Sequence, residues 1–123
     1  EQPLAGVMRA MYISDSDTDA ERVARPAYAQ WYESLDWLWQ LRSQKIPISI
    51  SPSYDDARTA GTLVVGGPDT VRRELIDQER TAGFNYLVLQ LAFGSLTHAQ
   101  EQRSLGLFGA EVMPALAELN SRN

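Results

Sequence analysis

The stretch from Thr62 to Leu96 constrains the fold of this 123-residue chain most, because it holds two apolar runs separated by one helical pattern. The first run, Leu63 to Val65, ends at Gly66-Gly67-Pro68, which is typical of a strand that breaks into a tight turn. Pro68 suits the first helical position, because its fixed φ fits a helix and its missing N–H costs nothing there. A helix is therefore predicted to begin at Pro68.

The rest of this stretch predicts a helix followed by a second strand. Val71, Leu75 and Ala82 lie close to one helical face, and Gly83 is placed to end the helix in the left-handed conformation. The run from Phe84 to Phe93 is nearly all apolar and rich in β-formers, which predicts a strand covered on both faces. The two strands should be parallel, so that the turns after them lie on one edge of the sheet, where functional groups collect.

A strand and a long helix are predicted before this stretch. Val7 to Ser14 is the predicted strand, and Thr18 with Glu21 forms a predicted capping box that begins the helix. Apolar residues at spacings of three and four carry the helix to about Arg42, and Pro26 is expected to kink or restart it. The face is formed by Ala24, Tyr28, Trp31, Leu35 and Leu38.

The segment 43–61 has the composition of a connecting loop, with two prolines and frequent Ser, Asp and Gly. Ser53 to Ala60 has room for a turn or two of helix. A lid or subunit contact and a disordered surface loop are both compatible with this composition.

A final helix is predicted after the second capping box, Thr97 with Gln100. Its apolar stripe is interrupted by Pro114. The stripe consists of Leu105, Phe108, Val112, Leu116 and Leu119.

The first predicted helix is rich in aromatic residues. These residues could stack on a ligand, or they could pack in the core. Packing is favoured, because aromatics at helical spacing are mostly core residues. Trp37 and Trp39 lie off the main face, which suggests contact with another subunit or with a further part of the protein.

Several motifs, taken in chain order, resemble the C-terminal part of luciferase-like flavin-dependent monooxygenases. The resemblance runs from about Val7 to Leu116. The motifs are Asp17–Glu21, Ala24–Tyr28, Val65–Val71, Gly83–Tyr86, Ala92–Leu96, Arg103–Leu105, Leu107–Phe108 and Glu111–Pro114.

The resemblance implies an α/β fold in which residues 1–123 form one partial domain. That domain would comprise three consecutive strand-helix units, the C-terminal portion of a TIM-type (β/α)8 barrel. It also implies FMN as the cofactor, or a deazaflavin in one branch of the family, and a small organic molecule as the substrate. The family's best-known active-site residues come mostly from earlier strands, so no catalytic residue is carried over.

Length and composition agree with an incomplete barrel. The chain has 123 residues, whereas a complete barrel needs about 200 or more. Because it begins with Glu1, it is expected to be a processed product or a fragment of a longer polypeptide.

A net charge of −5 and a pI near 4.8 argue against nucleic-acid or anionic-membrane partners. The sequence has no cysteine, which excludes disulfides and thiolate chemistry and fits a cytoplasmic protein.

Two turns are candidate flavin or substrate sites. Gly66, Gly67, Asp69 and Thr70 could bind a phosphate at a helix N-terminus, although structural capping explains the same residues and the Asp69 carboxylate competes for the positive helix end. Gln90, Phe93 and Gly94 could border the flavin or substrate, or could simply complete a strand end.

The remaining polar candidate is His98, the only histidine, which is expected to be a surface residue. The sequence shows no metal-ligand spacing, so no metal site is predicted.

Two functional hypotheses follow. The first is an oxidoreductase segment that contributes one side of a flavin pocket. The second is a non-catalytic module derived from the barrel that assembles with another chain. Either hypothesis predicts partners, namely the remaining barrel segment, another chain or a homo-oligomer, because three strands with open edges expose apolar surface.

Overall fold

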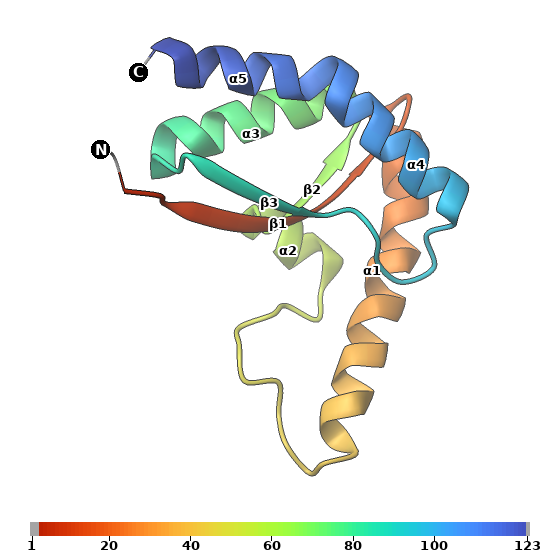
Figure 1. The fold of residues 1–123 in the computed structure, drawn as a ribbon. Coiled ribbons are helices and arrows are strands. Elements are labelled where there is room, and N and C mark those ends of the chain that lie inside the picture. The colour runs from red at the N-terminus through yellow and green to blue at the C-terminus, as the bar shows by residue number, and fades with distance from the viewer. Residues whose placement is uncertain (1–2, 123) are drawn as a thin grey trace.

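The computed structural model describes residues 3–122 as a three-stranded parallel sheet with helices on both faces (Figure 1). The elements are β1 (Gly6–Ile13), α1 (Asp17–Gln40), α2 (Tyr54–Ala60), β2 (Leu63–Gly66), α3 (Pro68–Ala82), β3 (Tyr86–Gln90), α4 (His98–Leu107), the π-helix η1 (Phe108–Val112) and α5 (Met113–Arg122). Among these helices none is both long and apolar enough to cross a bilayer.

The strand order β2-β1-β3 contradicts the predicted fold class. Three consecutive strand-helix units of a TIM-type (β/α)8 barrel would place each strand beside the next one in the chain. Here β1 lies between β2 and β3 and pairs in parallel with both, so β2 and β3 are not neighbours. The barrel prediction is wrong, and the chain is a small α/β domain built on one open sheet.

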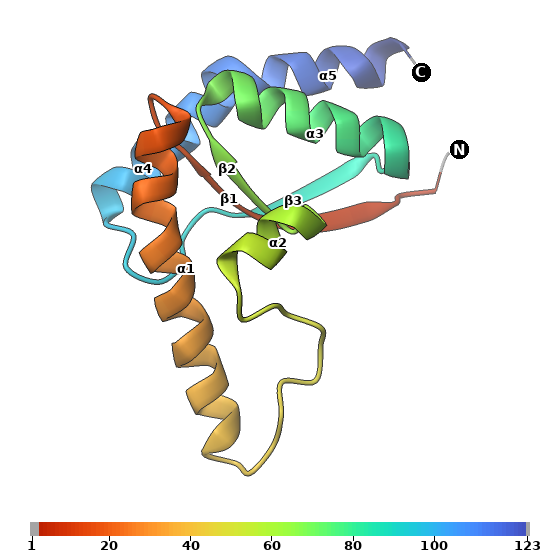
Figure 2. The ribbon, with the colours of Figure 1, turned by 180° about the vertical axis from the view of Figure 1, so that it is seen from behind.

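The two crossovers explain this order. The chain moves from β1 to β2 in one direction and then returns across β1 to reach β3. Because β-α-β crossovers are right-handed, connections that run in opposite directions place their helices on opposite faces. Accordingly α1 and α2 cover one face, and α3, α4 and α5 lie on the other (Figures 1 and 2).

Each face of the sheet has its own apolar core. The first core lies under α1 and α2 and includes Tyr12, Ala20, Ala24, Ala27, Tyr28, Tyr54, Ala57, Leu63, Val65, Phe93 and Leu96. The second lies under α3 and the C-terminal helices and includes Met11, Ile13, Val64, Val71, Leu75, Phe108 and Val112. Side chains that alternate along β1 and β2 therefore serve both cores, as expected of a strand between two helical layers.

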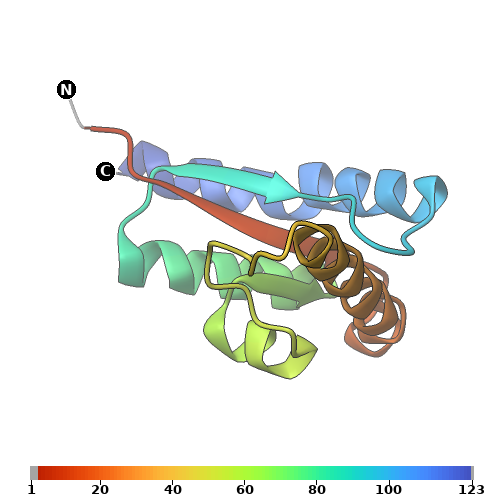
Figure 3. The ribbon, with the colours of Figure 1, turned by 90° about the horizontal axis from the view of Figure 1, so that it is seen from below.

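The strand β3 is shorter and less covered than predicted. It spans Tyr86–Gln90, and only Leu87 and Leu89 pack against the second core. Tyr86 and Val88 point to the opposite face and are exposed there. The expectation of a strand covered on both faces is wrong, because α1 and α2 extend over β1 and β2 and leave β3 open (Figure 3).

The predicted helix signals are partly confirmed. Gly83 caps α3 with a φ of 70°, and Thr97 with Gln100 forms the predicted capping box of α4. The cap of α1 is Ser16 rather than Thr18, and Pro26 does not break this helix. Pro114 lies in the first turn of α5, and the helical run from α4 through η1 to α5 continues past it.

The C-terminal end of β1 depends on one serine from α4. The pairing of β1 with β3 ends at Ala10 and Gln90, whereas β1 continues to Ile13. The N–H of Ile13 donates to the Oγ of Ser104 at 3.0 Å, and Ser104 is fully buried. Ser104 thus replaces the partner that β3 no longer offers. The sequence analysis had predicted Leu105, the next residue, as part of the buried stripe of this helix, but Leu105 is exposed.

Replacing Ser104 with Ala should lower the free energy of unfolding by about 1–3 kcal/mol, because the buried N–H of Ile13 would lose its acceptor. Urea unfolding followed by circular dichroism measures this change. Ser95→Ala, at an exposed position, is the control and should change stability by less than about 0.5 kcal/mol. Equal stability of the two variants would contradict this role for Ser104.

Candidate functional site

Three turns meet at the edge formed by the C-terminal ends of the strands. They follow β1 at residues 14–16, β2 at Gly67 and β3 at residues 91–97. Because β1 is the central strand, its turn lies between the two turns that the sequence analysis expected to be neighbours. The strands β2 and β3 are consequently about 10 Å apart, or two strand spacings.

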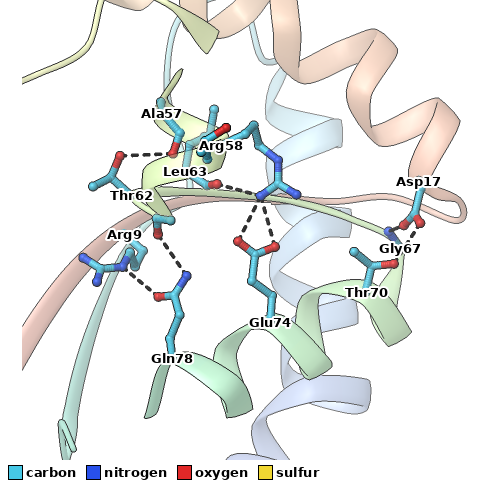
Figure 4. A network of polar contacts seen from close by, with 12 residues as sticks. Arg9, Asp17, Ala57, Arg58, Thr62, Leu63, Gly67, Thr70, Glu74 and Gln78 are labelled. Carbon is cyan, nitrogen blue, oxygen red and sulfur yellow. Dashed lines mark hydrogen bonds and ion pairs between the residues drawn. The ribbon is translucent and has the colours of Figure 1, made fainter. Parts of the chain in front are cut away.

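The N-terminus of α3 is occupied by the carboxylate of Asp17, at the start of α1 (Figure 4). Asp17 Oδ1 accepts from the N–H of Gly67 at 2.7 Å, and Oδ2 accepts from the hydroxyl of Thr70 at 2.8 Å. A carboxylate is well placed there, because free N–H groups and the helix dipole both favour negative charge. Asp17 therefore joins the first turns of α1 and α3 across the sheet edge.

Asp17 bears directly on the predicted phosphate site at Gly66, Gly67, Asp69 and Thr70. The N–H of Gly67 and the hydroxyl of Thr70 are already engaged by Asp17, so a phosphate at this turn would compete with a carboxylate for these two donors. A Cβ on Gly66 would lie 2.8 Å from Asp17 Oδ1, which explains the glycine structurally. The expected competing carboxylate is Asp17 rather than Asp69, which instead pairs with Arg72.

The contacts of Asp17 lower the pKa of its carboxyl group. The N–H of Gly67 is the largest cause, the hydroxyl of Thr70 is the next, and partial burial opposes both. Because the folded state prefers the ionised form, Asp17 stabilises the fold above its unfolded pKa. This contribution is lost as the pH falls through the lowered pKa of the folded state.

The second predicted site, after β3, consists mainly of packing residues. Phe93 is buried in the first core, and Gly94 has a φ of 57°. A Cβ on Gly94 would lie 1.8 Å from the carbonyl oxygen of Ala27, so only glycine permits this turn to rest on α1. Gln90 remains the member of this set with a partly exposed side chain, and its Nε2 donates to the carbonyl oxygen of Ala92 at the long distance of 3.5 Å.

A polar cluster after β1 was missed in the sequence analysis. The Ser14 hydroxyl donates to Asp19, whose other oxygen accepts from Arg22 at 2.6 Å. Both contacts lower the pKa of Asp19. The pKa of the buried Tyr12 phenol is raised, first by desolvation and then by the charge of Asp19.

The cluster extends to α4, since Asp15 pairs with Arg103. The signal for it was the run Asp15-Ser16-Asp17-Thr18-Asp19 at a strand end, which the sequence analysis interpreted as a helix start and, from Asp17, as part of the family resemblance.

The outer edge of β2 is closed by a polar network (Figure 4). Arg58 donates to the carbonyl oxygen of Leu63 at 2.7 Å and pairs with Glu74 at 3.1 Å. Gln78 Nε2 donates to the carbonyl oxygen of Gly61 at 3.0 Å, and Arg9 Nε donates to Gln78 Oε1 at 2.9 Å. These contacts satisfy edge carbonyl groups that would otherwise be open to another strand.

An open cavity of about 460 Å³ lies beside this network, between α2 and α3. It borders Arg58, Arg73, Glu74 and Asp77, so its guanidinium groups are accompanied by carboxylates. Its walls extend along α3 from Thr70 to Ala82, so they include one of the predicted flavin residues, Thr70, as well as the C-terminal half of the helix.

Arg25 and Tyr28 connect α1 to α2 and the loop before it. Arg25 pairs with Asp55 at 3.0 Å and lies 4.4 Å above the ring centre of Tyr54. The hydroxyl of Tyr28 donates to the carbonyl oxygen of Ser51 at 2.5 Å. The segment 43–61 is therefore anchored at its C-terminal part and contains the predicted short helix.

The packing role expected for the aromatic residues is confirmed for Tyr28. Its ring is buried and lies 5.5 Å from that of Trp31. Trp37, in contrast, is exposed on the last turns of α1. His98 is exposed at the start of α4, as predicted.

Among the described side chains, no three His, Cys, Asp or Glu residues are grouped as a metal ion would require. In the same part of the chain, no buried side-chain nitrogen or oxygen lacks a hydrogen-bond partner.

Comparison with known proteins relates the fold to part of a larger enzyme. No family profile matches the sequence. The chain is 35% identical over 91 residues to the uncharacterized protein y4wF of Sinorhizobium fredii, a match that covers 74% of this chain and 27% of that protein. The chain thus spans about a quarter of the length of this relative.

A solved structure with a similar fold is the monooxygenase RslO1 from Streptomyces bottropensis. Its TM-score is 0.65 at 22% sequence identity, over 89% of this chain and 30% of that one. The chain therefore shares the fold of a portion of a monooxygenase.

Gly94→Ala should lower the free energy of unfolding by about 2–4 kcal/mol, because the new Cβ would meet the carbonyl oxygen of Ala27 and the backbone is left-handed. Gly106→Ala is the matched control, since nothing lies within 4 Å of a Cβ added there. In α4 this control should raise stability by about 0.5–1 kcal/mol. Urea unfolding compares the two, and a harmless Gly94→Ala would disprove the close contact.

Asp17→Asn should lower stability by about 1 kcal/mol near pH 7, because the amide caps α3 less well than the carboxylate. The difference from the unchanged protein should be complete above the ordinary carboxyl pKa of 3.8 and should shrink as the pH falls below it. Denaturant unfolding at several pH values measures this dependence. A difference for Asp17→Asn that stays constant over this pH range would contradict the capping role.

Proposed function

We propose that this chain is a structural part of a luciferase-like flavin-dependent monooxygenase and contributes one wall of the site for flavin and a small organic substrate. The observation that carries the proposal is the likeness of 89% of the chain to part of the monooxygenase RslO1. The motif resemblance in the sequence supports the same class of enzyme independently. FMN is the favoured cofactor, and a deazaflavin is the alternative.

Gln90 is the residue through which the chain would most directly reach the flavin or substrate. It ends β3 at the edge where functional groups of parallel sheets collect, and its side chain is partly exposed. Phe93 and Gly94 would act indirectly, because they hold the following loop against α1. The flavin ring would supply the redox chemistry, whereas these residues would position the loop and exclude water.

The phosphate role of the turn after β2 requires Asp17 to release Gly67 and Thr70. A phosphate would compete with this carboxylate for the same two donors. If the turn binds FMN, removal of the carboxylate in Asp17→Ala should strengthen binding. Weaker or unchanged binding in this variant would restrict Gly66, Gly67, Asp69 and Thr70 to a structural role.

A non-catalytic interaction module is the second candidate function. It is favoured by the exposed apolar side chains of β1 and β3, which form a surface suited to another protein. In that case the chain would bind another chain tightly without carrying flavin.

Native mass spectrometry of the protein as purified from its own cells separates the two functions. The proposed function predicts about one flavin per chain in a larger polypeptide or complex, and the released flavin identifies FMN or a deazaflavin. A flavin-free assembly would support the interaction module instead. A flavin-free 13.7 kDa chain would contradict the monooxygenase assignment for this product.

In the flavin-containing protein, Gln90→Ala should weaken FMN binding about 10-fold, equivalent to about 1.4 kcal/mol, if Gln90 borders the ring. Fluorescence titration of the flavin-depleted protein measures the dissociation constant. Gln30→Ala, at an exposed position of α1, is the matched control and should bind FMN normally. An unchanged constant in Gln90→Ala would exclude Gln90 from the site.

A further inference from the structure

A small polar cavity lies at the C-terminal end of β2, where the starts of α1, α2 and α3 come together. Its volume is about 210 Å³, and its lining includes Val65 of β2, Thr70 of α3 and Tyr54 of α2. Figure 4 shows the side chain of Arg58, which also lines it, extending from α2 toward the point where Asp17 and Thr70 meet. Because α1, α2 and β2 pack on one core of this chain, the shape of the cavity does not depend on what covers the sheet at β3.

The hydroxyl group of Tyr54 is directed into this cavity. Tyr54 is only 7% exposed, yet its hydroxyl forms no hydrogen bond with the described residues. Its ring is fixed by the guanidinium group of Arg25, 4.4 Å above the ring centre, and by the ring of Tyr28, which meets it edge-on. Every fully buried side-chain oxygen in the described part of the chain has a partner, so the Tyr54 hydroxyl must reach an accessible space, and the cavity is that space. A hydroxyl placed in this way is available to a polar group of a ligand.

The cavity carries an excess of negative charge. Three carboxylates line it, those of Asp17, Glu21 and Asp55. Glu21 and Asp55 share one cation, Arg25, at 2.6 Å and 3.0 Å. Arg58, the cation in the lining, is already paired with Glu74. The donors that bind Asp17 are uncharged, so its charge is not neutralised by them. This balance favours a positively charged ligand.

The donor and acceptor groups of the cavity suit an ammonium group better than a metal ion. Among the described residues, no three metal-binding side chains are close enough together to hold a metal. An alkylammonium group is larger and has three N–H donors, which hydroxyl and carboxylate oxygens can accept. Glu21 Oε1 accepts from Arg25, which leaves Oε2 for such a donor. Val65 supplies an apolar wall for a short alkyl chain.

We propose that this cavity binds a small primary amine in its ammonium form, whose N–H groups donate to the Tyr54 hydroxyl oxygen and to the carboxylates of Glu21 and Asp17. A volume of about 210 Å³ corresponds to on the order of seven water molecules, so the ligand is compact. The pKa of Asp17 is lowered, first by the N–H of Gly67, so this carboxylate is ionised at neutral pH. The amine site does not rest on flavin binding, because neither Tyr54 nor Glu21 belongs to the residues proposed to contact the flavin.

Calorimetric titration with butylammonium chloride tests the proposal on the protein as purified from its own cells, after dialysis into amine-free buffer. One butylammonium should bind per chain, and binding should remain saturable in about 0.15 M NaCl. Butan-1-ol, which has the same length but no charge, should bind at least about 10-fold more weakly. Equal binding of butan-1-ol would overturn the proposal, as would the absence of saturable butylammonium binding up to about 50 mM.

Two substitutions locate the bound amine. Tyr54→Phe keeps the ring but removes the hydroxyl, and Glu21→Gln removes the charge, so each should raise the dissociation constant of butylammonium at least about 10-fold. The matched controls are Tyr86→Phe and Glu33→Gln, at exposed positions outside the cavity, and both should bind butylammonium normally. Circular dichroism verifies folding, and Glu21→Gln decides the outcome if Tyr54→Phe does not fold. Unchanged binding in a folded Tyr54→Phe or Glu21→Gln variant would overturn the proposed site.

Discussion

The fold depends on β1 being hydrogen-bonded along both of its edges. β2 pairs with its C-terminal half and β3 with its N-terminal half, so the two neighbours overlap on β1 only at Ala10. Beyond that point Ser104 takes over from β3 at the N–H of Ile13. This staggered pairing draws α4 against the end of β1 and leaves the first half of the sheet with two strands. The two-stranded half is also the half without a covering helix on one face.

Local chemistry was sufficient to predict most individual elements. The turn at Gly66-Gly67-Pro68, the cap at Gly83 and the capping box at Thr97 each depend on a few adjacent residues, and the structure contains all three. Strand order depends on contacts far apart in the chain, which the sequence pattern does not encode. The apolar run of β3 was predicted to be covered on both faces, because Tyr86 and Val88 are large and apolar. Their residue types do not indicate whether a helix of the chain covers them, and in the structure they are exposed.

The candidate site shows the same division between local and distant effects. A Gly-Gly turn before a helix correctly indicated a place for an anion, but the anion is a carboxylate 50 residues away in sequence. Asp17 could be recognised only once β1 was known to lie beside β2, because that pairing brings the start of α1 to the start of α3. Gly94 was likewise predicted as a site residue, although the structure explains it by packing. The close approach of Gly94 to the carbonyl oxygen of Ala27 is a tertiary contact, which the neighbouring residues in the sequence do not indicate.

The two sides of the sheet differ in a way that links assembly to the proposed site. The β2 side of the sheet is covered, because helices pack on both faces of β2 and the Arg58–Glu74 pair lies along its outer backbone edge. The β3 side has one uncovered face. Gln90 lies on this face with the exposed Tyr86 and Val88, since the three residues occupy every second position of one strand. Any protein surface that covers this face therefore also forms the opposite wall of the space beside Gln90. A ligand pocket at Gln90 would thus need a second protein surface, because the described residues provide only one wall, the sheet face of β3.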